Sequence, residues 1–214
     1  MSVSIEALEA LLASRRSVRA FEDRAVPSEL VERILRAAVL APSASNKQPW
    51  RFFVMDDRPK IRALADHVRA EKARIAAHIG EGFKESFLAY GDYFTRFERA
   101  PLVVAPAARS LTILSNLVDD ALDADTRAVI RKMEDDSGLI GTSLALGNML
   151  LAAHALGLGA SAMTGPLVAR GAVESAFGVP TGWSVVALFA LGYPAEAPSA
   201  TDRKDATKVT RYVR

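Results

Sequence analysis

Hydrophobic residues recur along the chain with spacings that predict alternating helices and short strands. Residues 1–13 read as a short helix, and a second helix spans residues 27–41, where it ends because Pro42 disfavours helical backbone in the residue before it. Residues 51–55 are rich in aromatic and branched side chains and predict a strand. Apolar residues between Ile61 and Val68 then recur with a period near 3.6, which predicts a longer helix.

The second half of the chain continues this alternation. An aromatic stripe predicts the next helix: Phe83, Phe87, Tyr90, Phe94 and Phe97. Residues 102–105 predict a second strand, an uncharged helix over residues 138–156 leads into a third, and residues 184–191 predict a fourth. The late run 209–213 is also β-prone. Because the helices outnumber the strands and differ in length, the expected fold class is α+β with a mixed sheet rather than a regular βαβ repeat.

Composition favours one compact domain over residues 1–214. Half of the 214 residues are hydrophobic and 24% are charged, which is ordinary for a globular protein with a sizeable core. Lys and Arg exceed Asp and Glu by only two, which argues against a nucleic-acid partner. The chain has no cysteine, which excludes disulfides, cysteine-bound metals and thiol nucleophiles. The first twelve residues do not resemble a signal peptide, so a cytoplasmic protein is expected.

One segment raises the alternative of a membrane protein. Residues 137–169 contain no Asp, Glu, Lys or Arg, and that length could span a bilayer. Glycine and proline interrupt the run, however, and it contains Asn148 and His154 without an aromatic belt at its ends. A helix buried on all sides in a soluble core explains the pattern better, and no membrane association is expected.

Two further patterns have ordinary explanations. Residues 157–162 satisfy the glycine spacing of a dinucleotide-binding turn, but they follow a helix and enter a strand, which is the reverse of that turn's order. The acidic run 119–125 lacks the glycine and the terminal glutamate of a calcium loop. A solvated loop or helix accounts for this acidic run.

Two clusters have residue types that suit a binding site. In the first, Arg15, Arg16, Ser17 and Arg19 lie within five residues just after a helix, an arrangement suited to bidentate binding of a phosphate. For this cluster alone, a solvated run of charge is the alternative. The second cluster, residues 42–50, is a polar loop of small residues whose backbone amides and Asn46 side chain can hydrogen-bond a flat polar ring.

Together the two clusters resemble the nitroreductase family of flavoenzymes, whose pattern RRSxRxF followed by PSxxNxQPW is matched by residues 15–21 and 42–50. Residues 157–165 look like that family's GLG turn and the strand end beside the flavin, and residues 191–194 look like its closing strand. The resemblance implies a nitroreductase-like fold, with a mixed central sheet surrounded by helices in an intertwined homodimer. It also implies that residues 195–214 form a C-terminal extension that reaches onto the partner.

The family binds two FMN molecules at the dimer interface, and the resemblance implies a role for each residue of the arginine cluster. Arg15 and Ser17 would hold the phosphate and ribityl chain, and Arg16 would line that side of the cofactor. Arg19 would approach the pyrimidine edge of the isoalloxazine ring. A cation there stabilises the anionic reduced flavin, although some members of the family use lysine at this position.

The other implied contacts come from the polar loop of the partner chain, from the end of the third strand and from the C-terminal segment. The partner's loop would contribute three residues: Ser43, Ala44 and Asn46. The third strand would place a side chain and two backbone amides beside the ring: Met163, Thr164 and Gly165. Some members of the family carry an acidic residue at the position of Thr164. Either Arg203 or Lys204 would complete the phosphate site.

The implied reaction is transfer of electrons from NADH or NADPH, through FMN, to a nitroaromatic, quinone or similar electron-poor substrate in a ping-pong scheme. The chemistry belongs largely to the flavin, so no protein nucleophile or general base is required. Flavin-consuming or dehalogenating chemistry within the same superfamily is one alternative. A flavin-binding protein without turnover is another.

The resemblance offers an explanation for two further features of the sequence. The uncharged helix would lie at the dimer centre, where small residues let two helices approach: Gly141, Ser143, Ala145 and Gly147. A helix buried in the core of one chain is the alternative. The aromatic stripe falls where the family places its variable pocket wall, and ordinary core packing is at least as good an explanation for most of these rings.

Overall fold

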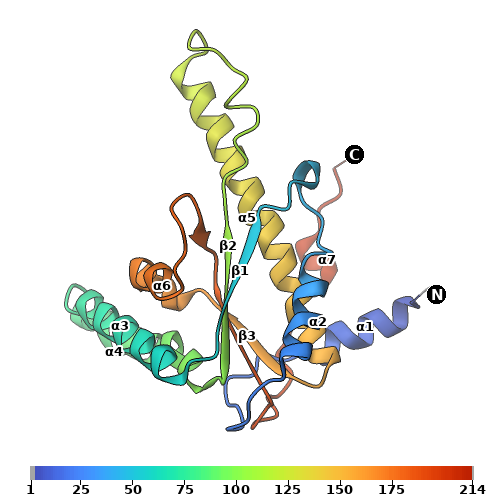
Figure 1. Ribbon diagram of the computed structural model, residues 1–214, viewed down its shortest axis with the longest axis vertical. Helices are drawn as coiled ribbons and strands as arrows, with labels where there is room; N and C mark the ends of the chain where they lie inside the picture. The colour runs from blue at the N-terminus through green and yellow to red at the C-terminus, as the bar shows by residue number, and fades with distance from the viewer. Residues whose placement is uncertain (1–2, 214) are drawn as a thin grey trace.

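The computed structural model describes residues 3–213 and contains a five-stranded sheet with helices on both of its faces (Figure 1). The strands lie in the order β1 (Trp50–Met55), β2 (Leu102–Ala108), β5 (Leu188–Gly192) and β3 (Gly159–Met163), and the short β4 (Ser184–Val185) also pairs with β2. All of these ladders are antiparallel. The one parallel pairing within residues 3–213 is the isolated bridge between Ser17 and Ala160. The predicted α+β class is confirmed.

One face of the sheet is covered by α2 (Ser28–Ala38) and α5 (Ala124–Ala155). Ile34 of α2 and Met149 of α5 are buried here against Phe189 of β5, in the core of this face. The first helix, α1 (Ile5–Ser14), lies beside the C-terminal end of α5, where Ser14 Oγ is 2.8 Å from His154 Nε2. The predicted first two residues of this helix lie outside the described residues.

The other face is covered by α3 (Arg58–Ala76), the 3₁₀ segments η2 (Asp92–Arg99) and η3 (Gly165–Ala169), and α6 (Arg170–Ala176). The predicted helical stripe is confirmed, because its four members are buried: Ile61, Leu64, Ala65 and Val68. Between α3 and η2 lies α4 (Glu81–Gly91), and α7 (Ala206–Val209) is near the C-terminus. A further 3₁₀ segment, η1 (Ala44–Asn46), precedes β1.

Helix α5 is much longer than the predicted helix of residues 138–156. It begins where the Asp123 side chain accepts a hydrogen bond from the Thr126 amide at 2.8 Å, and its first half projects from the body as an arm (Figure 1). The segment before the helix lies close to it. Gly138 is required for this approach, because a Cβ at this position would overlap the Arg109 carbonyl oxygen. Charged residues in the first half of the helix hid its full length from the sequence pattern.

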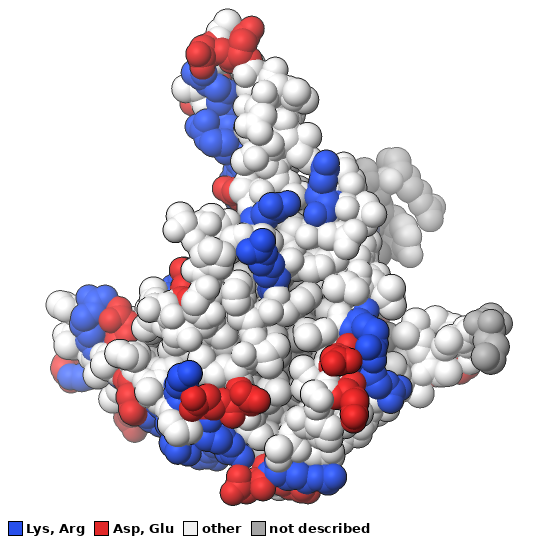
Figure 2. Space-filling view, viewed as in Figure 1, with Lys and Arg blue, Asp and Glu red and all other residues white. Residues whose placement is uncertain are grey.

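The prediction that this helix is buried on all sides is wrong for the single chain. Leu139, Ile140 and Leu144 are 47%, 59% and 45% exposed, and Figure 2 shows a broad uncharged surface on the projecting arm. Gly141 and Ala145, in contrast, face inward. Of the four small residues expected at a dimer centre, Ser143 and Gly147 are therefore the two on the accessible side. The helix contains an 18-residue stretch with a mean hydropathy of 1.3, which is long and apolar enough to span a membrane, but its buried side packs on α2 and the sheet.

Three smaller predictions need correction. The helix predicted to end at residue 41 ends at Ala38, and a tight turn leads to Pro42. The single strand predicted over residues 184–191 is divided into β4 and β5, because its pairing with β2 shifts by one residue between Val185, which pairs with Ala107, and Phe189, which pairs with Val104. The β-prone run 209–213 is not a strand. It begins at the last residue of α7, whose start is capped by Asp205, and it is exposed without a neighbouring strand in the described chain.

Candidate functional site

The arginine cluster lies on one side of a cavity of about 400 Å³ between the end of α1 and the C-terminal segment. Arg15, Arg16 and Arg203 all line this cavity, and Glu9 is the acidic residue of its lining. Arg16 is held in place by donating to the carbonyls of Ala13 and Arg15, at 2.6 and 2.9 Å. Three guanidinium groups around one small cavity provide the charge and the paired donors that a phosphate requires.

The backbone after this cluster is fastened to the sheet. The Val18 amide donates to the Ala160 carbonyl at 3.0 Å, next to the bridge between Ser17 and Ala160. Gly159 permits this approach, because a Cβ there would lie only 2.7 Å from Val18 Cγ1. The arginine cluster is thereby held beside β3, whose C-terminal end forms the second part of the site.

The second cavity, of about 330 Å³, brings together four of the predicted residues. Arg19 lies at its edge, and Ala162, Met163, Thr164 and Gly165 at the end of β3 line it. Tyr90, Tyr93 and Phe94 complete the lining. Gly165 and Phe94 pack so closely that a Cβ on Gly165 would overlap the phenylalanine ring.

Arg19 is positioned by contacts on both its backbone and its side chain. Its amide donates to Glu196 Oε1 at 2.5 Å, and the next amide, that of Ala20, donates to the same oxygen at 3.0 Å. The guanidinium lies 5.5 Å from the centroid of the Tyr93 ring and donates to the Ser17 carbonyl at 3.4 Å. Sequence reasoning missed Glu196, because a lone carboxylate in a segment without periodicity gives no signal of its own.

The backbone of the polar loop is strained at three residues. Ser45, Asn46 and Gln48 all have positive φ, at 49°, 50° and 48°, which is uncommon for residues other than glycine. The Gln48 amide donates to Ser43 Oγ at 2.9 Å, and the Gln48 side chain donates to Asn46 Oδ1 at 3.4 Å. Ser43 and Ala44 line a separate cavity of about 240 Å³ beside the exposed face of α5.

Within one chain the polar loop and the arginine cluster lie at opposite ends of the sheet. Ala160, next to the cluster, is in register with Leu191 and through it with Leu102 at the start of β2. Trp50, next to the loop, pairs with Ala108 at the end of β2. Six residues of a strand separate these rows by about 20 Å. The single chain therefore does not bring the two predicted clusters into one site.

The C-terminal segment is partly placed on its own chain. Arg203 lines the cavity of the arginine cluster, whereas Lys204 is exposed and is not among the lining residues. The Ala195 amide donates to the Ala20 carbonyl at 3.0 Å, so the start of the segment also follows its own chain. The reach of later residues onto a partner stays a prediction.

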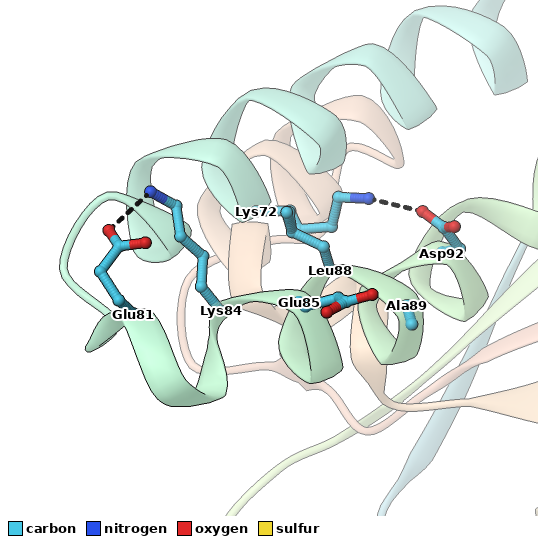
Figure 3. Close-up of a pocket in the computed structure, with 7 residues that line it drawn as sticks. All are labelled: Lys72, Glu81, Lys84, Glu85, Leu88, Ala89 and Asp92. Carbon is cyan, nitrogen blue, oxygen red and sulfur yellow. Dashed lines mark hydrogen bonds and ion pairs between the residues drawn. The ribbon is translucent and has the colours of Figure 1, made fainter.

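A larger hollow, of about 580 Å³, lies between α3 and α4, away from the predicted residues (Figure 3). Lys72 pairs with Asp92 at 2.8 Å and Lys84 pairs with Glu81 at 3.3 Å. Because its cations are already paired with carboxylates from its own lining, this hollow has less charge to offer a ligand than the arginine-lined cavity.

Known proteins resemble this chain in sequence and in fold. The chain is 32% identical over 205 residues to an NADH dehydrogenase of Thermus thermophilus, and the match covers 92% of each chain. In structure it resembles a BluB-like flavoprotein from Clostridium difficile, with a TM-score of 0.83, 22% identity and coverage of 97% and 99% of the two chains. It also resembles an iodotyrosine deiodinase bound to FMN and 3-iodo-L-tyrosine, with a TM-score of 0.73, 22% identity and coverage of 97% and 99%.

The sequence profile of the nitroreductase family matches residues 12–193. This range includes the arginine cluster, the polar loop and the end of β3, and it ends just after β5. The family resemblance expected from the sequence motifs is confirmed, and so is the fold. The chain belongs to the nitroreductase family of oxidoreductases.

Proposed function

We propose that this protein is an FMN-dependent oxidoreductase that transfers electrons from NADH or NADPH to nitroaromatic, quinone or similar electron-poor acceptors by a ping-pong mechanism. The observation that carries the proposal is the pair of cavities joined by residues 15–19. One is lined by Arg15, Arg16 and Arg203, and the other by Arg19 and the end of β3. A cytoplasmic location is part of the proposal. The chain contains no cysteine, so it has no disulfide that would need an oxidising compartment.

The residues present fit FMN. Arg15 and Arg19 are four residues apart, so the chain between them spans at most about 14 Å. A ligand with one phosphate at one end and a flat ring at the other can therefore contact both arginines. The described cavities provide one cluster of guanidinium groups for one phosphate, which favours FMN over FAD.

Within this proposal each part of the chain has a defined task. The flavin, when bound, supplies the two-electron chemistry. Arg15, Arg16 and Arg203 would bind the phosphate, and Arg19 would place a positive charge at the edge of the ring. The backbone amides of Thr164 and Gly165 would donate hydrogen bonds to the ring, and the neighbouring aromatic side chains would shield it from water.

We place the second half of the site on another copy of the chain. The separation of about 20 Å between the arginine cluster and the polar loop requires this if both contact the same flavin. The exposed side of α5 supplies an apolar surface for such a homodimer, and Ser43 and Ala44 lie directly beside Ile140 and Leu144 on that surface. Leu144→Glu is expected to give a monomer that loses FMN, whereas Leu88→Glu on exposed α4 keeps both the dimer and the flavin. A flavin-loaded monomer by light scattering would contradict this assignment.

The function itself is tested on the purified protein. It is expected to release FMN on denaturation, and to oxidise NADH or NADPH in the presence of a nitroarene or a quinone. A protein that binds FMN but oxidises neither donor is a non-catalytic flavin-binding protein. Release of halide from 3-iodotyrosine without nitroarene reduction would indicate a dehalogenating enzyme instead. Recovery of FAD, or of no flavin after reconstitution, would refute the assigned cofactor.

A further inference from the structure

Arg19 and Tyr93 lie against each other on the wall of one cavity. The Cζ atom of Arg19 is 5.5 Å from the centroid of the Tyr93 ring, which is within the range of a cation–π contact. Both side chains line the cavity at the end of β3. Tyr93 is 44% exposed, so its ring does not serve to fill the core. The contact therefore belongs to the wall of the cavity itself.

The Arg19 side chain is held by this ring and not by an acidic partner. Within residues 3–213, no carboxylate forms an ion pair with its guanidinium, and the lining of the cavity contains no Asp or Glu. The guanidinium also donates a long hydrogen bond, of 3.4 Å, to the Ser17 carbonyl. A carboxylate would offset the charge that it holds, whereas an aromatic ring has no net charge. The positive charge of Arg19 is therefore fixed in place without being neutralised.

Tyr93 is itself held by its own segment, η2. The next residue, Phe94, is buried and packs closely on the end of β3. Arg96 lies 4.0 Å from the centroid of the Tyr93 ring. Lys72, which pairs with Asp92 at 2.8 Å (Figure 3), lowers the pKa of Asp92, and the charge of Arg96 lowers it further. Arg96 thus has an acidic neighbour outside the cavity, and Tyr93 is a fixed surface on which Arg19 can rest.

We infer that Tyr93 is a positioning residue for Arg19, whose guanidinium it holds at the edge of the cavity, where the positive charge favours the reduced form of the cofactor. Without the ring, the guanidinium is free to turn toward solvent, where water screens its charge. This inference rests on the proposed function and adds a residue that tunes the reduction potential of the cofactor.

The test measures the midpoint potential of the bound flavin in the holoenzyme, relative to that of free FMN. This difference reports the ratio of the dissociation constants for oxidised and reduced FMN. Tyr93→Leu removes the aromatic ring, and it is expected to weaken the preference for reduced FMN about threefold, which lowers the potential by about 14 mV at about 30 mV per tenfold change. Tyr93→Gln also lacks the ring and should give the same shift. Tyr93→Phe keeps the ring and should keep the wild-type potential.

A second background separates positioning from a general disturbance of the cavity. If Tyr93 acts through Arg19, adding Tyr93→Leu to Arg19→Gln causes no further change in the potential. A disturbed cavity would shift the potential equally in both backgrounds. The matched control is Phe83→Leu on the neighbouring α4. Phe83 is 76% exposed and is not among the residues that line the cavity, so this variant should keep the wild-type potential.

The outcomes distinguish this inference from the proposed function. An unchanged potential in both Tyr93→Leu and Tyr93→Gln, or an equal shift in the wild-type and Arg19→Gln backgrounds, overturns the role of Tyr93 and leaves the oxidoreductase function intact. If the protein binds FMN but oxidises neither NADH nor NADPH, the proposed turnover fails, and the potentials still decide the role of Tyr93. A protein that binds no FMN refutes both.

Discussion

The backbone amide of Arg19 donates a hydrogen bond to the carboxylate of Glu196, which lies 177 positions later in the chain. The same Oε1 atom accepts the Ala20 amide, so one side chain fixes two consecutive peptide units at 2.5 and 3.0 Å. The direction in which Arg19 leaves the backbone therefore depends on the segment after β5. This links the C-terminal segment to the proposed cofactor site independently of any contact with a partner chain.

Replacing Glu196 tests this link. Glu196→Ala removes the shared acceptor, and it is expected to weaken FMN binding about fivefold. That is about 1 kcal/mol, below the roughly 1.5 to 3 kcal/mol of a hydrogen bond to a charged group, because this pair is exposed. Asp202→Ala, which removes an exposed carboxylate from the same segment, is the control. Flavin affinities measured by fluorescence should separate the two variants, and equal affinities would refute a positioning role for Glu196.

The packing of Gly165 on Phe94 gives a second prediction. Gly165→Ala places a methyl group where the Phe94 ring now lies, so the ring must move and the cavity must change shape. Loss of about 1 to 3 kcal/mol of stability is expected, with a fall in acceptor turnover. Gly171→Ala is a matched control, because a Cβ there meets nothing within 4 Å. Adding Phe94→Leu to Gly165→Ala should recover part of the lost stability. Thermal denaturation of the wild type and the three variants measures this recovery. If the double variant is no more stable than Gly165→Ala, the Phe94 ring is not what the added methyl group displaces.

The sequence pattern predicted those elements whose local signal and final burial agree. The stripe around Ile61 and Leu64 is buried as expected, and the strand at residues 51–55 is extended by one residue. The pattern failed where burial depends on distant contacts. The first half of helix α5 is charged and lacks an apolar period, so the sequence pattern predicted only its uncharged second half. Residues 209–213 have β-prone side chains, but no strand lies beside them in the described chain.

In the candidate site, too, the residues that belong to local motifs were predicted and those placed by distant contacts were not. Motif order identified Arg15, Arg19 and the end of β3, and the structure places them around two neighbouring cavities. Glu196 belongs to no motif, because it reaches Arg19 only when the segment after β5 folds back onto the start of the chain. The fold was likewise needed to show that Arg203, and not Lys204, lines the cavity, since adjacent residues in an irregular segment have no periodicity to distinguish them.

A third prediction concerns the buried Glu134, which ties the segment before α5 to the helix. Its Oε1 accepts the amides of Ile113, Leu114 and Ser115 at 2.6, 2.5 and 3.1 Å. Hydrogen bonds from Ser115, followed by those from the other amides, hold the pKa of Glu134 below its usual value. The charged form is thus favoured in the folded protein.

A depressed pKa in the folded state gives stability that is present above the unfolded pKa, about 4.3, and is lost as the pH falls through the folded pKa. Glu134→Gln is therefore expected to lower Tm most near pH 7, and the difference from the wild type should shrink below about pH 4. Glu29→Gln, which changes an exposed carboxylate on α2, is the control. A difference in Tm that stays constant from neutral to acidic pH would show that the charge of Glu134 is not responsible.

The last prediction separates the two ends of the proposed cofactor site. Arg15 lines the cavity with Arg16 and Arg203, whereas Arg19 lies in the other cavity beside Met163 and Thr164. The phosphate carries its charge in both redox states, but the ring is neutral when oxidised and anionic when reduced. A cation at the ring therefore stabilises the reduced state selectively, and a cation at the phosphate stabilises both states equally.

Arg19→Gln should keep most of the FMN while making its reduction harder. Loss of a partly buried interaction of about 1 to 2 kcal/mol lowers a two-electron potential by roughly 20 to 45 mV, at about 1.4 kcal/mol per 30 mV. Arg15→Gln should do the reverse, weakening FMN binding with a nearly unchanged potential in the protein that remains loaded. Flavin affinity and midpoint potential measured for both variants decide between the roles. If Arg19→Gln loses FMN while its potential is unaltered, the two arginines have been assigned to the wrong ends of the cofactor, even though the chain is a nitroreductase-family protein.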